Sequence, residues 1–296
     1  MQKRNIILFF LYKYFSKLKD KPNLITKLIV RLGNILSIDY WTGYTVLNIN
    51  SKKKGGGQKL LYPPIIILNR IDNKFYVEPP FSVSNWLPHE YEKGLLHPCL
   101  DRLREGDVVI DIGANVGFFS ILASERVGKE GKVYSFEPVL ETAAILENVI
   151  NINMIKNIIL ERKALAGRVG KGFIRYSYGG DAFAMMMDKS NTHLDLIHPL
   201  EKTRTVEIEI TTLDEYLSNI ELSNLKLIKI DVEGQEMAVL KSSIKTISRY
   251  KPTIICEFWG DEQLKKGEEF FKSIDYNKIY SDTDGKGLNN TVYSPL

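Results

Sequence analysis

The chain has 296 residues, of which 44% are hydrophobic and 26% are charged, and this composition excludes a largely disordered protein. The length suits one α/β domain with additions, or two small domains. The formal net charge is +4, but residues 1–38 carry eight basic and one acidic side chain, so the remaining body is mildly acidic and argues against nucleic acid as a partner.

Residues 1–36 form a basic arm, in which Pro22 separates two predicted helices over about 4–19 and 23–36. The apolar run at 6–12 is shorter than the roughly 20 residues of a membrane span. No small-residue cleavage site of a signal peptide follows it. We interpret the arm as a cap packed on the main domain or as a partner-binding helix. A basic amphipathic anchor, giving peripheral membrane contact through residues 1–36, is the alternative.

The segment between the arm and the core contains a linker, a hairpin and a helix. Residues 51–57 include three glycines but no G-K-[ST] sequence, so they are interpreted as an exposed linker rather than a phosphate cradle. Apolar runs on either side of Asp72-Asn73 predict a small hairpin, and residues 89–104 predict a helix. We expect a domain boundary near residue 85, which divides the chain into a 1–85 extension and an 86–296 catalytic domain.

From residue 106 onward, apolar strand patterns alternate with helix patterns. This alternation predicts a parallel sheet covered by helices on both faces, with ligands at the carboxyl ends of the strands. The predicted strands are 108–113, 132–138, one from 158, 225–230 and 252–259, and the predicted helices are 118–127, 140–152, one ending near 247, and 261–273.

The first strand of this core ends in the turn Asp111–Gly117. Gly113 permits a tight turn, and Gly117 is expected to let the helix and the strand approach closely. The glycines are spaced G-x-x-x-G, which departs from the G-x-G-x-x-G pattern of dinucleotide sites. Asp111 would repel a diphosphate but suits a cationic ligand such as a methionine-type ammonium. The charge therefore favours S-adenosylmethionine over NAD.

Glu137 follows the second strand. A carboxylate at this place can accept hydrogen bonds from both hydroxyls of a ribose. Its spacing after the glycine turn matches the acid found about 20 residues on in nucleoside-binding folds. A solvated loop carboxylate is the alternative interpretation.

Residues 171–205 form a long connection between the third and fourth strands, which we interpret as a lid or an acceptor wall. The segment contains three consecutive methionines, Met185–Met187, and two histidines, His193 and His198. Either histidine could serve as a general base, although an unpaired surface histidine is commoner. Thr212 to Glu215 match a helix capping box and need no catalytic role.

Two acids, Asp231 and Glu233, follow the fourth strand and are the candidate catalytic residues. One of them could orient a substrate hydroxyl or accept its proton. Charge stabilisation of a helix N-terminus is the alternative for Glu233. No metal site is predicted, because two neighbouring acids without a clear third ligand are weak evidence for one. The only cysteines, Cys99 and Cys256, have no metal-ligand spacing and suit a reducing compartment, so a cytoplasmic location is expected.

Four segments resemble the FkbM-type methyltransferase family: Val109–Ser120, Tyr134–Pro138, Asn148–Asn153 and Ile228–Leu240. Three motifs within them are similar to the family in order and spacing: Ile110–Gly117, Ser135–Pro138 and Lys229–Glu236. The resemblance covers about residues 90–260. It implies a class I, Rossmann-like methyltransferase sheet of seven mostly parallel strands with helices on both faces. It also implies bound S-adenosylmethionine and usually O-methylation of a sugar, glycolipid or polyketide-like acceptor.

The same resemblance implies roles for individual residues. Glu137 would lie at the ribose, Ala164 near the adenine, and Asp231 at the junction of cofactor and acceptor. The remaining cofactor residues would surround the methionine portion: Asp111, Gly113, Asn115 and Gly117.

Our leading hypothesis is an enzyme that transfers a methyl group from S-adenosylmethionine to a hydroxyl oxygen of a small-molecule or glycan acceptor. An NAD-linked oxidoreductase is the second enzymatic hypothesis. A cofactor-binding scaffold, docked on a membrane or a partner through its basic arm, is the non-enzymatic one.

Overall fold

The computed structural model describes residues 67–71, 74–78, 93–177, 184–186, 203–283 and 288–296. The two predicted helices of the arm, the 51–57 linker, Met187, His193 and His198 lie outside the described residues. In the part of the chain that is described, no helix combines the length and the apolar character that crossing a membrane requires.

The predicted hairpin is confirmed. Strands β1 (Ile67–Ile71) and β2 (Lys74–Glu78) pair antiparallel on either side of residues 72–73. The helix predicted over 89–104 is shorter in the structure, where α3 spans Lys93–Leu100. Residues 101–104 leave the helix in turns, with the amide of Leu103 donating to the carbonyl of Leu100.

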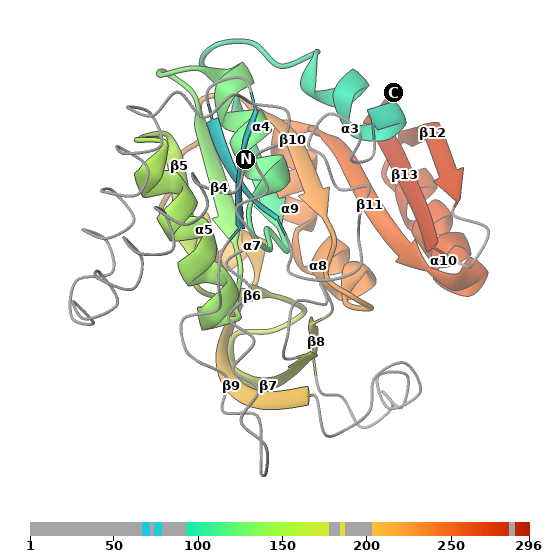
Figure 1. Ribbon diagram of the computed structural model, residues 1–296. Helices are drawn as coiled ribbons and strands as arrows, with labels where there is room; N and C mark the ends of the chain where they lie inside the picture. Colours follow the sequence, from blue (N-terminus) through green and yellow to red (C-terminus); the bar gives the residue numbers. More distant parts are fainter. Residues whose placement is uncertain (1–66, 72–73, 79–92, 178–183, 187–202, 284–287) are drawn as a thin grey trace, which may run out of the picture.

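A sheet of seven strands forms the centre of the molecule, in the order β12-β13-β11-β10-β3-β4-β5 (Figure 1). Strand β13 is antiparallel to both of its neighbours, and the other pairings are parallel. The mostly parallel α/β architecture expected from the sequence is therefore confirmed. The strands are β3 (Val108–Ile112), β4 (Lys132–Phe136), β5 (Ile158–Glu161), β10 (Leu225–Ile230), β11 (Thr253–Trp259), β12 (Tyr276–Thr283) and β13 (Leu288–Pro295).

Helices cover both faces of the sheet. Successive side chains of a strand point to opposite faces, so each strand contributes side chains to a core on either side. On one face, Val109 and Leu227 pack in a core with α3 and α4, and on the other, Ile110 and Ile228 pack with the helices after β9. The helices are α4 (Phe118–Val127), α5 (Leu140–Ile152), α7 (Leu213–Tyr216), α8 (Glu236–Ser242), α9 (Ile244–Tyr250) and α10 (Gly260–Ser273). Both cysteines are free and buried, and Cys256 belongs to the same core as Ile110 and Ile228.

The helical segment that follows β10 differs from the prediction. The single helix predicted to run to about residue 247 is wrong, because α8 and α9 meet at the buried Ser243. There the Ser243 hydroxyl donates to the carbonyl of Val239, and a separate residue, Asp214, accepts the first amides of α9. The capping box at the start of α7 is confirmed, since the amide of Glu215 donates to Thr212 Oγ1 over 3.1 Å.

A second sheet of four strands, in the order β6-β9-β7-β8, lies below the carboxyl ends of the central strands in Figure 1. Its core side chains Ile174, Tyr176 and Ile210 pack with Val139, which follows β4. The long connection predicted as a lid or wall thus contains strands that the sequence pattern did not indicate. They are β7 (Gly170–Ser177), β8 (Ala184–Met186) and the start of β9 (Thr203–Thr211), whereas β6 (Ala164–Leu165) precedes the connection.

The order of the strands places a switch point between β3 and β10. The chain passes from β3 outward to β4 and β5, and later returns to β10 and β11 on the other side. Neighbouring connections leave in opposite directions at such a point, and ligands bind at the carboxyl ends of the strands there. The loops after β3, β4 and β10 are therefore the expected ligand-binding loops.

Candidate active site

The glycine turn between β3 and α4 adopts a backbone that few residues tolerate. Gly113, Asn115 and Gly117 have φ angles of 83°, 50° and 94°. The amides of Gly113 and Ala114 both donate to the carbonyl of Phe136 at the end of β4, over 3.0 and 2.9 Å. Two of the three left-handed positions are glycine, which pays no steric penalty for this conformation.

Gly117 makes a different close approach from the one expected. A Cβ at this position would lie 2.2 Å from Cδ1 of Leu146, so Gly117 lets α4 start against α5. The expectation of a close helix–strand approach at Gly117 is therefore corrected to a helix–helix approach. The glycine is needed for packing next to the turn as well as for the turn itself.

Glu137 is buried and tied to the glycine turn. Its Oε2 accepts the amide of Asn115 over 3.0 Å, and its Oε1 accepts the amide of Val139 over 2.9 Å. Burial raises the pKa of Glu137 to about 7, although the two amides lower it in part. A carboxylate oxygen has more than one lone pair, so each oxygen keeps the capacity to accept a ribose hydroxyl. This carboxylate is not the solvated loop acid of the alternative interpretation.

Asp111 lies beneath the glycine turn and is fully buried. Its Oδ2 accepts the hydroxyl of Ser120, which in turn contacts the hydroxyl of Ser135 over 2.7 Å. Burial raises the pKa of Asp111, while the Lys229 ammonium and the Ser120 hydroxyl lower it. Its Oδ1 is buried without a hydrogen-bond partner among the described residues. Asp111 is thus placed to act on a ligand through its charge rather than as an exposed contact.

The loop after β10 carries the two predicted catalytic acids. Asp231 is partly exposed and accepts the ammonium of Lys229 at 2.7 Å through Oδ2. Glu233 and Gly234 have φ angles of 51° and 93°, and the amide of Gly234 donates to Glu236 Oε1 over 2.8 Å. Burial raises the pKa of Glu233 well above its usual range, with the charges of Asp231 and Glu236 adding to the effect.

A third acid, Glu257 on β11, lies beside these two. One carboxylate oxygen from each of Asp231, Glu233 and Glu257 lies within 4.8 Å of the other two. The sequence analysis did not single out Glu257. The available signal was a charged residue inside the otherwise apolar run Ile254–Trp259.

Ala164 lies three residues beyond the end of β5, in the short strand β6, and is buried. The amide of Glu137 donates to the carbonyl of Glu161 at the end of β5, so both residues belong to the same edge of the sheet. The structure therefore gathers the predicted cofactor residues and the predicted acids at one edge, around the switch point.

These residues fit S-adenosylmethionine better than a diphosphate cofactor. The edge holds the buried carboxylates Asp111 and Glu137, and Asp231 follows on the next loop. Asp111 Oδ1, which has no hydrogen-bond partner among the described residues, adds negative potential under the turn. Such a site attracts a cationic sulfonium or ammonium and repels a pyrophosphate.

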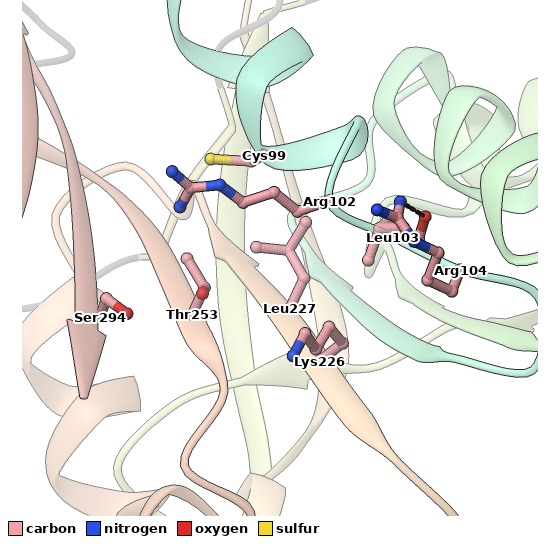
Figure 2. Close-up of a pocket in the computed structure, with 8 residues that line it drawn as sticks. All are labelled: Cys99, Arg102, Leu103, Arg104, Lys226, Leu227, Thr253 and Ser294. Atoms are coloured by element: carbon pink, nitrogen blue, oxygen red, sulfur yellow. Dashed lines mark hydrogen bonds between the residues drawn. The ribbon is translucent and has the colours of Figure 1, made fainter. Parts of the chain in front are cut away.

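A separate pocket of about 350 Å³ lies at the opposite, amino-terminal edge of the sheet, where β10 and β11 begin (Figure 2). Because the candidate residues follow the carboxyl ends of the strands, this pocket is not part of the candidate active site. Its lining residues are Cys99, Arg102, Leu103, Arg104, Lys226, Leu227, Thr253 and Ser294.

Comparison with known families gives an independent result. Residues 111–277, more than half of the chain, match the family described as the Methyltransferase FkbM domain. The matched segment begins at Asp111, runs through the glycine turn and Glu137, and includes all three acids of the cluster.

Individual relatives are more distant. "Methyltransferase 1" of Beauveria bassiana is 27% identical over 143 residues, which are 45% of this chain and 57% of that protein. "Hexuronic acid methyltransferase AglP" of Haloferax volcanii is 21% identical over 164 residues, which are 55% of this chain and 61% of that protein. The matches thus span about three fifths of these relatives' lengths. A solved structure of "Methyltransferase FkbM" from Methylobacillus flagellatus KT is 18% identical, covers 70% of this chain and 50% of that chain, and gives a TM-score of 0.45.

Proposed function

The chain belongs to the FkbM methyltransferase family, and from that membership we propose that it transfers the methyl group of S-adenosylmethionine to a hydroxyl oxygen of a sugar or glycolipid. The observation that carries this proposal is the hydrogen bond between Glu137 and the amide of Asn115. It joins the candidate ribose carboxylate to the glycine turn that would hold the methionine portion.

The glycine turn and Glu137 would bind the cofactor. Glu137 would accept the ribose hydroxyls, and Gly113, Asn115 and Gly117 would surround the methionine portion. Asp111 would contribute negative potential from beneath the turn, and Ala164 would lie near the adenine. When bound, S-adenosylmethionine supplies an electrophilic methyl group on a positively charged sulfur.

The acids after β10 would handle the acceptor. In the net reaction, the acceptor oxygen gains the methyl group, the sulfur–methyl bond breaks with its electron pair remaining on sulfur, and the hydroxyl proton leaves the acceptor. Asp231 or Glu233 would receive that proton or orient the hydroxyl. Most of the rate enhancement would come from holding the reacting atoms in line in a site from which water is excluded.

A sugar acceptor is supported by the name of one relative, a hexuronic acid methyltransferase, and by the position of the four-stranded sheet next to this edge, where it would border the acceptor. An NAD-linked oxidoreductase is disfavoured, because a buried carboxylate lies where a diphosphate would need to approach the turn.

The proposal is tested by incubating the protein with S-adenosylmethionine that carries a deuterated methyl group. The acceptors are hexoses, hexuronic acids and a glycolipid extract, and mass spectrometry locates the label. We expect the label on an oxygen of a carbohydrate, and much slower transfer by Asp231→Asn. Label on nitrogen or carbon alone, or no binding of S-adenosylhomocysteine in calorimetry, would contradict the proposed function.

A further inference from the structure

Three carboxylates from two neighbouring strands converge next to the candidate catalytic loop. Asp231 and Glu233 follow β10, and Glu257 lies on β11, which pairs with β10 in parallel. One oxygen from each lies within 4.8 Å of the other two. In an octahedral magnesium site with metal–oxygen distances of about 2.1 Å, opposite ligands stand about 4.2 Å apart. Neighbouring ligands in the same site stand about 3.0 Å apart, so the three oxygens would have to move closer together by small side-chain rotations to hold the cation.

One member of this group is unsatisfied. Oε2 of Glu233 is buried and has no hydrogen-bond partner among the described residues. A buried carboxylate oxygen without a partner is costly, so it calls for a proton, a donor or a cation. The Trp259 side chain interacts with the Glu233 carboxylate and lowers its pKa in part, but Oε2 itself makes no hydrogen bond of normal geometry among the described residues. This observation is independent of the spacing of the three acids, and it points to a positively charged ligand.

The charges lead to the same conclusion. Asp231, Glu233 and Glu257 together carry three negative charges when ionised, and Lys229 supplies one positive charge through its 2.7 Å contact with Asp231 Oδ2. When all four groups are ionised, their net charge is −2, and a divalent cation carries the matching opposite charge. Lys229 contacts one oxygen of Asp231, so the other oxygen can serve as a ligand. Hard carboxylate oxygens select cations of the magnesium and manganese class over softer metals.

We propose that Asp231, Glu233 and Glu257 bind one divalent cation, Mg²⁺ or Mn²⁺. Resting on the proposed function, we assign this cation the task of holding the acceptor through its reactive hydroxyl and a neighbouring oxygen. Three protein ligands leave open positions for those two oxygens. The preferred acceptor class is therefore a vicinal diol or a hydroxy acid, rather than an isolated hydroxyl. Glu257 becomes a binding residue that the sequence analysis did not identify.

The test uses Mn²⁺ alone as the probe, with the full chain and without S-adenosylmethionine. The protein is first treated with a chelator and dialysed to remove bound metal. Mn²⁺ is then added, and the free Mn²⁺ is measured by electron paramagnetic resonance. We expect one Mn²⁺ per chain, and at least ten-fold weaker binding in Glu233→Gln and in Glu257→Gln. The matched control is Glu207→Gln, which removes an exposed carboxylate on β9 that pairs with Lys171. It should leave Mn²⁺ affinity unchanged.

No Mn²⁺ binding by the wild type, or a smaller than ten-fold loss in either variant, overturns the proposal. Thermal melting establishes that each variant is folded, and if Glu257→Gln does not fold, Glu233→Gln decides. Calorimetry with S-adenosylhomocysteine in excess chelator separates the two hypotheses. Cofactor binding without a manganese site leaves the proposed function intact and removes the cation. A manganese site without cofactor binding leaves the cation site intact and removes the proposed function.

Discussion

Gly113 packs against the main chain of Asp231, so closely that a Cβ on Gly113 would stand 1.8 Å from the Asp231 carbonyl oxygen. The amide of Asp231 also donates to the carbonyl of Ile112 over 3.0 Å. The glycine turn after β3 and the acidic loop after β10 are therefore one rigid unit, although they are far apart in the sequence. A substitution that displaces the backbone of one segment should therefore also displace the other.

Replacing Gly113 with alanine tests this unit. Alanine in a left-handed conformation costs about 1–2 kcal/mol, and a collision with fixed backbone adds about 1–3 kcal/mol. We therefore expect Gly113→Ala to lower the free energy of unfolding in urea by about 2–5 kcal/mol. We also expect it to weaken S-adenosylhomocysteine binding in calorimetry.

Gly106→Ala is the matched control. Gly106 has a similar φ of 88°, but no atom lies within 4 Å of the place where its Cβ would be. It should lose only about 1–2 kcal/mol, the conformational part of the cost. Equal losses of unfolding free energy in the two variants would show that the close contact between Gly113 and Asp231 does not contribute to the cost of Gly113→Ala.

The pKa of Glu137 predicts a pH dependence of cofactor binding. Burial raises this pKa to about 7, and the neighbouring charges of Asp111 and Asp231 add to the effect, while the Val139 and Asn115 amides oppose it. In the proposed site the ionised carboxylate would accept both ribose hydroxyls, so affinity for S-adenosylhomocysteine should rise by about ten-fold between pH 6 and pH 8. Glu137→Gln should flatten this rise.

Stability should change with pH in the opposite direction. Because the pKa of Glu137 is higher in the folded chain than in the unfolded chain, its contribution to stability is fully present below about pH 4.5 and is lost as the pH rises through about 7.

Glu236→Gln is the control for the pH dependence of cofactor binding, because burial also raises the pKa of Glu236 to about 7. If cofactor affinity lost its pH dependence in Glu236→Gln and kept it in Glu137→Gln, Glu137 would not be the ribose acid.

Asp231→Asn should separate chemistry from cofactor binding. If Asp231 orients the acceptor hydroxyl or takes its proton, turnover should fall by about 100- to 10,000-fold. Affinity for S-adenosylhomocysteine should change much less. The control is Asp261→Asn, at an exposed position in the first turn of α10. Parallel losses of turnover and affinity would instead make Asp231 a cofactor-positioning residue.

Asp214 stabilises the start of α9, although it lies 31 residues before Lys245 in the sequence. Its carboxylate accepts the amides of Lys245 and Thr246 over 3.0 and 2.8 Å, and also the Thr246 hydroxyl over 2.7 Å. Asp214→Ala should reduce the free energy of unfolding by about 1–2 kcal/mol, the usual cost of removing a helix cap. Asp214→Asn keeps one acceptor oxygen and should lose less. Urea denaturation of the two variants measures the difference, and an equal loss would contradict the capping role.

The sequence predicted the repeating part of this fold well, because local patterns determine it. Apolar strand runs and the glycine turn identified β3, α4 and α5 with close boundaries. The residue pattern did not indicate β12 and β13, nor the strands of the second sheet. Their side chains alternate less regularly, since Phe173 and Ile279 are exposed while polar Thr291 is buried. Such strands are held by pairing with neighbours, which the local sequence does not reveal.

The candidate site shows the same division. Glu137, Asp231 and Glu233 could be identified because each follows an apolar strand at the edge where ligands bind. Glu257 could not, because its relevance depends on β11 lying beside β10. The contact between Gly113 and Asp231 likewise depends on the order of the strands, and one sequence does not give that order.

Both thiols of the chain are buried, and this gives the protein two built-in chemical reporters of its own opening. Burial raises the pKa of Cys99 to about 11 and that of Cys256 well above 9. The thiolate is the reactive form, so the folded chain should resist alkylation at both positions. Cys99 lies on α3 and Cys256 in the middle of the central sheet. The order in which the two are alkylated would therefore show, peptide by peptide, whether α3 detaches before the sheet itself comes apart.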